Sequence, residues 1–337
     1  MLAPEVLFKF PEGRECTIRY YSLARYALLE ALRLMDIGPG KRVLLPSFIC
    51  RDLLAPIMML GAEPRWYEVG ADLVPVASPD TWPEAEVVLA INYFGFAQDL
   101  QPFVEYSQRT GATLVEDNAH GYLSRDTKGA WLGTRAPIGL FSLRKTLRIP
   151  DGAALLLNEP ALAVRAPAQI PLDGAGINPA QALKSRMRQI PLVGGALLRA
   201  STLAARAARK WKTGSATPVP DPASESELPA GPSPWTGLQG ALAAFDVPAE
   251  IVRRRQAYAE CAREGARVGV LPVFPALPDN CAPYGYPFRS NPSGRAAMQR
   301  QADQMGFDLV TWPDLPGACE TTAPSYYRDV FLINFLW

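Results

Sequence analysis

The first half of the chain alternates short apolar stretches with segments of helical periodicity. Between residues 23 and 35 apolar side chains recur at helical spacing, and Gly38-Pro39-Gly40 follows directly. The predicted strands are residues 42–46, 64–69, 86–92, 112–117, 138–142 and 153–158. Short apolar strands separated by helices predict an α/β fold with a mostly parallel central sheet and helices on both faces. Ligands in such sheets bind where the strands end.

The composition of the second half indicates a smaller unit. Residues 1–235 are predicted to form a large domain, which includes a basic helical segment and a loop within 180–235, and residues 236–337 a small α+β domain. In the small domain we expect helices over 238–265 and 293–305 and strands over 286–289 and 308–312.

Composition excludes several classes of function. The 337 residues carry a net charge of +1, which argues against bulk binding to nucleic acid. The five cysteines form no CxxC pair and there is one histidine, so neither a disulfide framework nor a metal site is expected. Residues 1–10 lack the pattern of a signal peptide, and no apolar stretch is long enough to span a membrane. We therefore expect a cytoplasmic protein.

An acid, an imidazole and an amine follow two neighbouring predicted strands. Asp117 ends one strand, His120 is the only histidine, and Lys145 follows the next strand, whereas Glu116 is expected on the opposite face. Pyridoxal phosphate requires a lysine for a Schiff base and a carboxylate facing its ring nitrogen. Its phosphate favours a helix N-terminus, such as the one at Ala24 and Arg25. Alone, such an aspartate or lysine is usually a turn former or a solvated side chain; together they predict this cofactor.

The chain resembles the DegT/DnrJ/EryC1/StrS family of sugar aminotransferases, which have fold type I of the enzymes that depend on pyridoxal phosphate. The similarity lies in motifs spread over most of the chain. They are Arg25-Tyr26-Ala27-Leu28, Val43-Leu44-Leu45-Pro46-Ser47, Asn92-Tyr93-Phe94-Gly95, Glu116-Asp117-Asn118-Ala119-His120, Phe141-Ser142 to Lys145 with Asp151-Gly152, and Trp312-Pro313-Asp314-Leu315-Pro316.

The resemblance implies roles for individual residues. Lys145 would form the internal aldimine, Asp117 would pair with the pyridine nitrogen, and His120 would lie near the ring hydroxyl. Ser142, Ala24 and Arg25 would hold the phosphate, and either Cys50 or Phe48 would stack on the ring. The serine precedes the lysine by three residues here, a shorter spacing than the family's usual one. The family also implies a homodimer.

The resulting hypothesis is amino transfer from a donor such as glutamate to a keto sugar, carried on a nucleotide, in polysaccharide or secondary-metabolite biosynthesis. The alternatives are an enzyme of the same fold and cofactor with a different reaction or a non-sugar substrate, and a family relative without catalysis. Basic residues accumulate over 182–212, with no acidic residue between Asp173 and Asp221. They form a solvated face, or contact a diphosphate substrate or an anionic membrane.

Overall fold

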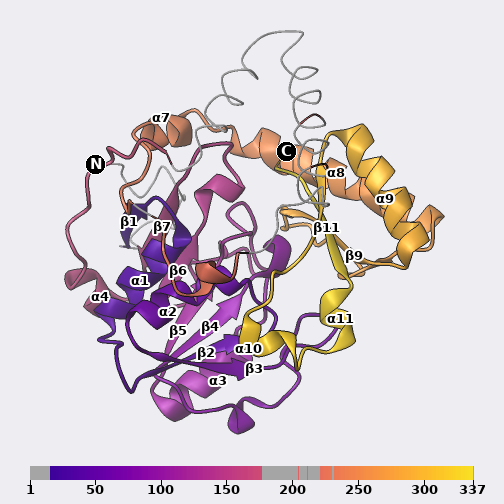
Figure 1. The fold of residues 1–337 in the computed structure, drawn as a ribbon. Coiled ribbons are helices and arrows are strands. Elements are labelled where there is room, and N and C mark those ends of the chain that lie inside the picture. The colour runs from indigo at the N-terminus through magenta and orange to yellow at the C-terminus, as the bar shows by residue number, and fades with distance from the viewer. Residues whose placement is uncertain (1–15, 177–203, 205–210, 212–220, 230, 337) are drawn as a thin grey trace.

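The computed structural model describes residues 16–176, 204, 211, 221–229 and 231–336, and its ribbon shows a large and a small sheet (Figure 1). The strands of the large sheet are β1 (Thr17–Tyr21), β2 (Arg42–Pro46), β3 (Glu63–Tyr67), β4 (Val87–Ile91), β5 (Thr113–Asp117), β6 (Ile138–Phe141) and β7 (Ala153–Leu157). Their order is β1-β7-β6-β5-β4-β2-β3. Strands β2 to β6 run parallel, whereas β7 and β1 are antiparallel to their neighbours. The predicted mostly parallel sheet is confirmed.

Helices cover both faces of this sheet because the connection after β2 and the connection after β4 run toward opposite edges of the sheet. Helix α2 (Ala55–Met59) connects β2 to β3 at one edge, and α3 (Gln101–Thr110) connects β4 to β5 toward the other. Right-handed crossovers in opposite directions place their helices on opposite faces. Helix α1 (Ala24–Leu34) packs against α2 and therefore shares its layer. Every residue of β4, β6 and β7 is buried, as expected for strands covered on both sides.

The reversal of strand order lies between β2 and β4. At such a point the connections diverge to opposite faces, and a crevice opens beyond the carboxyl ends of the strands. The segments that follow β2, β4, β5 and β6 all reach this edge. The fold therefore provides one place where their side chains meet.

The small sheet contains β8 (Leu271–Pro272), β9 (Gly285–Arg289), β10 (Asp308–Thr311) and β11 (Val330–Asn334) in the order β10-β11-β9-β8, all antiparallel. Helices α8 (Val247–Arg267) and α9 (Pro292–Met305) pack beside it (Figure 1). Side chains cap both helices: Asp246 accepts from the amide of Ala249 at 3.0 Å, and Asn291 from that of Gly294 at 2.9 Å.

Shorter elements complete the described chain. They are η2 (Arg51–Leu53), η3 (Pro79–Thr81), η4 (Tyr93–Gly95), η5 (Leu143–Lys145), α4 (Pro160–Val164), η6 (Pro222–Glu225), α7 (Leu238–Ala243), α10 (Gly317–Glu320) and α11 (Ser325–Arg328). No helix among the residues with described structure combines the length and apolar character required to cross a bilayer.

Some predicted elements differ from the observed ones. The helix expected over 238–265 is two helices, α7 and α8, because Asp246 caps a new helix with Pro248 in its first turn. Residues 51–59 form two short elements, η2 and α2, rather than one helix. Strands β1 and β11 were not predicted from the sequence. Apart from Ala204 and Trp211, the basic segment 182–212 lies outside the described residues, and the domain boundary at 235 stays a prediction.

Candidate functional site

A pocket opens at the carboxyl edge of the large sheet. Residues from the ends of β4, β5 and β6, from the start of α1 and from the small domain line it together. The lining residues are Leu23, Ala24, Arg25, Leu28, Ile49, Cys50, Asp52, Leu53, Ile91, Asn92, Asp117, Ala119, His120, Leu140, Ser142, Arg144, Lys145 and Trp312. The acid, imidazole and amine selected from the sequence thus share one cavity.

Asp117 is the last residue of β5 and is buried at the floor of this pocket. Its Oδ1 accepts a hydrogen bond of 2.8 Å from the amide of Ala119. Burial raises the pKa of the Asp117 carboxyl, and the Ala119 amide and the charge of Lys145 oppose that rise. The carboxylate is therefore held in place but lacks full compensation of its charge.

His120 joins the Asp117 segment to Lys145. The Nε2 atom of His120 lies 3.1 Å from the Nζ atom of Lys145, which belongs to the turn η5 directly after β6. The backbone N–H of Phe94 donates to Nδ1 of the same imidazole at 3.3 Å. Burial lowers the pKa of His120 well below its usual range, and the charges of Lys145 and Arg254 lower it further. The imidazole is therefore neutral near pH 7.

Aromatic side chains hold the imidazole from both sides. Tyr284 of the small domain stacks on it, with ring centroids 4.4 Å apart and planes within 2°. Phe94 lies nearly parallel at 5.8 Å, and Trp312 meets it edge-on at 5.5 Å. Contacts from three segments leave the ring of His120 little rotational freedom.

The backbone of Phe94 and Gly95 brings the small domain against this ring. Phe94 has φ +54°, an uncommon conformation for a residue with a side chain, and its carbonyl accepts from the amide of Tyr284 at 2.7 Å. Gly95 has φ +91°, and a Cβ there would lie 3.1 Å from the carbonyl oxygen of His120 and 3.2 Å from that of Ala282. Only glycine allows these three segments to approach so closely.

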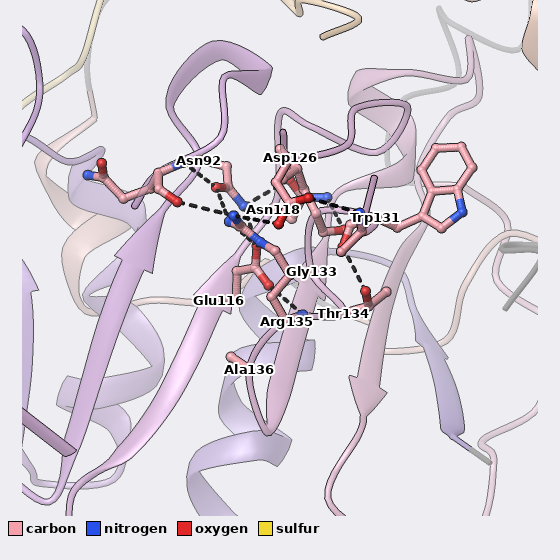
Figure 2. Close-up of polar contacts among 12 residues, drawn as sticks. Asn92, Glu116, Asn118, Asp126, Trp131, Gly133, Thr134, Arg135 and Ala136 are labelled. Carbon is pink, nitrogen blue, oxygen red and sulfur yellow. Dashed lines mark hydrogen bonds and ion pairs between the residues drawn. The ribbon is translucent and has the colours of Figure 1, made fainter. Parts of the chain in front are cut away.

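Glu116 points away from the pocket into a buried network on the other face of β5 (Figure 2). Its carboxylate accepts from Arg135 Nη2 at 2.6 Å, from Arg135 Nε at 2.8 Å and from Asn92 Nδ2 at 2.9 Å. Asn92 also bonds Asn118 Oδ1 at 3.2 Å. These bonds connect the segments after β4 and β5 and so fix the strand end that carries Asp117.

The structure places the remaining predicted residues as follows. Ala24, Arg25, Ser142 and Cys50 line the pocket, and burial raises the pKa of the Cys50 thiol to about 12. Phe48 does not line it; its ring is fully buried against Tyr93, Trp312 and Tyr327. Between the two residues considered for stacking on a ring, only Cys50 therefore reaches the cavity.

Three residues of the site were not selected from the sequence. Arg144 precedes Lys145 and lines the pocket, and its buried Nε has no hydrogen-bond partner within the described part of the chain. Tyr284 and Trp312 come from the small domain, 139 and 167 residues after Lys145. The Trp312 motif was noticed as a family feature, and Arg144 could have been selected as a cation next to the lysine; nothing local indicates Tyr284.

One end of the pocket suits an anion. Helix α1 begins there without a side-chain cap and without an acidic residue in its first turn. Its first amides therefore have no intrahelical acceptor and lie at the positive end of the helix dipole. Arg25, Ser142 and Arg144 line the same cavity, and the buried Nε of Arg144 has no hydrogen-bond partner among the residues that the structure describes. Asp52 lines the cavity as well, with its Oδ2 3.7 Å from the Nε of Arg25. A phosphate group fits this set of donors.

A metal centre finds less support. In the portion of the chain with described coordinates, no group of three or more histidine, cysteine, aspartate or glutamate side chains is placed to hold a metal ion.

Comparison with known proteins identifies the protein family of the segment that forms most of this pocket. The sequence model of the DegT/DnrJ/EryC1/StrS aminotransferase family matches residues 22–189, which include Asp117, His120 and Lys145. Residues 22–189 belong to this family. Protein MosB of Rhizobium meliloti is 31% identical over 146 residues, which cover 41% of this chain and 28% of MosB. The match thus spans little more than a quarter of that relative.

Solved structures similar to this chain extend the likeness in fold beyond the family match. The aminotransferase TlmJ of Streptoalloteichus hindustanus has a TM-score of 0.62 at 22% identity and covers 94% of this chain and 80% of its own. PseC of Helicobacter pylori, an aminotransferase involved in the biosynthesis of pseudoaminic acid, has a TM-score of 0.65 at 14% identity. The match covers 98% of this chain and 84% of PseC. The fold of this aminotransferase family therefore extends over nearly the whole chain.

Proposed function

We propose that the protein is a pyridoxal phosphate-dependent aminotransferase that acts on a keto sugar. The observation that carries this proposal is the convergence of Asp117, His120 and Lys145 in one pocket at the carboxyl edge of the sheet. Membership of residues 22–189 in an aminotransferase family supports it.

The residues of the pocket fit the cofactor at each point. The start of α1, Arg25, Ser142 and Arg144 would hold the phosphate with their donors. Arg25 also lies 3.7 Å from Asp52 Oδ2 in the same cavity, so the phosphate would share that guanidinium with a carboxylate. Asp117 would contact the pyridine nitrogen. Because its buried carboxylate lacks full compensation, a protonated ring nitrogen would supply the missing positive partner.

Bound pyridoxal phosphate supplies an aldehyde that condenses with amines and a ring that withdraws electrons. Lys145 offers the primary amine of the pocket, and its Nζ lies within hydrogen-bond distance of His120 Nε2. His120 orients this amine and can exchange a proton with it at Nε2. Asp117 keeps a carboxylate facing the site, and Trp312 with Tyr284 shields the imidazole from water.

The finer part of the proposal concerns substrates and setting. We propose glutamate or a similar amino acid as donor and a nucleotide-linked keto sugar as acceptor, in polysaccharide or secondary-metabolite biosynthesis. We also propose that the protein works as a homodimer in the cytoplasm. The involvement of PseC in pseudoaminic acid biosynthesis is in line with a sugar acceptor.

One experiment tests cofactor and chemistry together. Purified protein is incubated with pyridoxal phosphate, reduced with borohydride and digested, and the modified lysine is located by mass spectrometry. We expect the label on Lys145, its loss in Lys145→Ala, and its retention in Lys128→Ala, which removes an exposed lysine. Glutamate should then release ketoglutarate. Absence of any label would contradict the proposal, and label without ketoglutarate would indicate another donor or another reaction.

A further inference from the structure

A fully buried arginine of the small domain lies directly behind Lys145. Arg254, on helix α8, is 1% exposed. Its Nη2 donates to the carbonyl oxygen of Lys145 at 3.3 Å, and its Nη1 to that of Pro283 at 3.4 Å. Its Nε donates to Glu250 Oε1 at 2.8 Å, which pairs the guanidinium with a carboxylate one turn earlier.

The two carbonyl groups that accept from Arg254 belong to two different segments, and each segment places a side chain against His120. Lys145 carries the amine that faces His120, and Pro283 immediately precedes Tyr284, whose ring stacks on His120. One planar guanidinium therefore connects η5, which carries the amine of Lys145, to the segment of the small domain that carries Tyr284. The rigid fork of arginine suits such simultaneous contacts, whereas a lysine ammonium is a single point charge.

Stability alone does not account for an ion pair in this position. Burying Arg254 and Glu250 carries a desolvation cost, and well-packed apolar residues of similar volume often serve stability equally well or better. The contacts of Arg254 instead go to the backbone of the residue that the proposed chemistry requires. Buried charges with this kind of placement are typical of functional sites.

We propose that Arg254 is a positioning residue that fixes the backbone of Lys145, and so the direction of its amine toward His120, from the small domain. The proposal rests on the proposed function only in treating Lys145 as the amine that receives the cofactor. Glu250 contributes by keeping the guanidinium charged and oriented.

The charge of Arg254 has a second effect, on His120. The charged and titratable groups around that imidazole are Lys145 from η5, Arg254 from α8 and Tyr284 from the loop before β9, and the other neighbouring rings, Phe94 and Trp312, carry no charge. Asp117 shares the pocket, and the charge of Lys145 lowers the pKa of its carboxyl. The positive charge of Arg254 lowers the pKa of His120 and so helps to keep the imidazole neutral.

The test uses the full chain with three variants and a control. Arg254→Lys keeps the charge, Arg254→Met removes it, and the double variant Glu250→Gln/Arg254→Met removes both charges and so avoids an unpaired buried one. Arg263→Met, on an exposed position of the same helix, is the control. Thermal melts followed by circular dichroism establish which variants fold.

Two measurements on the folded variants then test the positioning role of Arg254. The first is the rate at which pyridoxal phosphate attaches to Lys145, trapped by borohydride; we expect it to fall about 10- to 100-fold in the folded double variant and less in Arg254→Lys. The second needs no cofactor: His120 is the only histidine, so ¹⁵N-histidine labelling of tag-free protein gives one imidazole. Its pKa should rise in the double variant, while burial and the charge of Lys145 still hold it below the usual range.

The outcomes separate this proposal from the proposed function. A folded double variant with the attachment rate and imidazole titration of the control would overturn the positioning role. If the unmodified protein does not bind pyridoxal phosphate, the proposed function is wrong. The positioning role of Arg254 is then tested by the imidazole signal of His120 alone. An Nε2 signal unchanged by the double substitution would then reject it, and a signal that loses its hydrogen-bond shift would support it.

Discussion

The imidazole of His120 and the amine of Lys145 lie 3.1 Å apart, between Nε2 and Nζ, in a buried environment. The other ring nitrogen, Nδ1, accepts from the N–H of Phe94 at 3.3 Å. A neutral imidazole carries one proton, and a nitrogen that accepts cannot bear it. The proton of His120 is therefore assigned to Nε2, and it can be donated to Nζ of Lys145 only while that amine is uncharged, because an ammonium has no acceptor.

This assignment predicts the state of His120 in solution. In ¹⁵N-histidine-labelled, tag-free protein without cofactor, we expect the neutral imidazole with its proton on Nε2 throughout the range in which an exposed histidine titrates. The reason is that burial and the charges of Lys145 and Arg254 disfavour the cation. A signal that titrates near pH 6.5, or a proton found on Nδ1, would contradict the geometry.

The same shift predicts how stability depends on pH. The pKa of His120 is lower in the folded than in the unfolded chain, so the unfolded chain binds the extra proton as the pH falls below about 6.5. The contribution of His120 to stability is thus complete above that pH and is lost below it, at up to about 1.4 kcal/mol per pH unit. Chemical denaturation at several pH values should show this slope, and His120→Gln should reduce it.

Asp117→Asn tests the carboxylate at the ring-nitrogen position. The amide is similar in size and keeps an acceptor for the amide of Ala119, so the fold and cofactor binding should persist. Catalysis should fall by several orders of magnitude, because the neutral side chain cannot hold a proton on the ring nitrogen. The measurement is single-turnover release of ketoglutarate. A rate near that of the unmodified protein would remove the proposed role of Asp117.

Glu116→Ala provides the contrasting case one residue earlier. Arg135 would lose its close charge partner within the network of Figure 2 and keep only Asp126, at 3.8 Å. Removing one member of a buried ion pair typically costs about 3–5 kcal/mol. We expect a loss of this size in urea denaturation. Under conditions where the variant is folded, attachment of the cofactor to Lys145 should continue. A loss of attachment without a loss of stability would place Glu116 in the site itself.

Arg144→Gln tests the anion end of the pocket. Loss of a charge-assisted hydrogen bond should weaken pyridoxal phosphate about 10- to 100-fold and leave the affinity for pyridoxal, which lacks the phosphate, unchanged. Absorbance titrations with both compounds make the comparison, with the exposed substitution Arg263→Gln as control. Equal weakening of both compounds would show that Arg144 does not bind the phosphate, and a raised KM for glutamate alone would assign it to a substrate carboxylate.

Much of the large sheet could be predicted from local patterns. The apolar runs ending at Pro46 and Asp117 correspond closely to β2 and β5, because a strand buried on both faces requires an unbroken apolar sequence. The common position of Asp117, His120 and Lys145 could be predicted too, since parallel strands end at one edge. The opposite orientation of Glu116 followed from the two-residue period of a strand.

The sequence by itself therefore determined the α/β class, the positions of the buried strands along the chain and the edge at which the reactive side chains meet, because these depend on periodicity and on short-range chain geometry. Only the tertiary structure decided which residues of the small domain complete the site. Tyr284 on the ring of His120 and Arg254 behind Lys145 come from segments more than 100 residues away, and contacts across that separation leave no local pattern. Their roles arise where the small domain packs against the segments that follow β4 and β6, and close approach and burial there, rather than sequence spacing, determine which side chains are in contact.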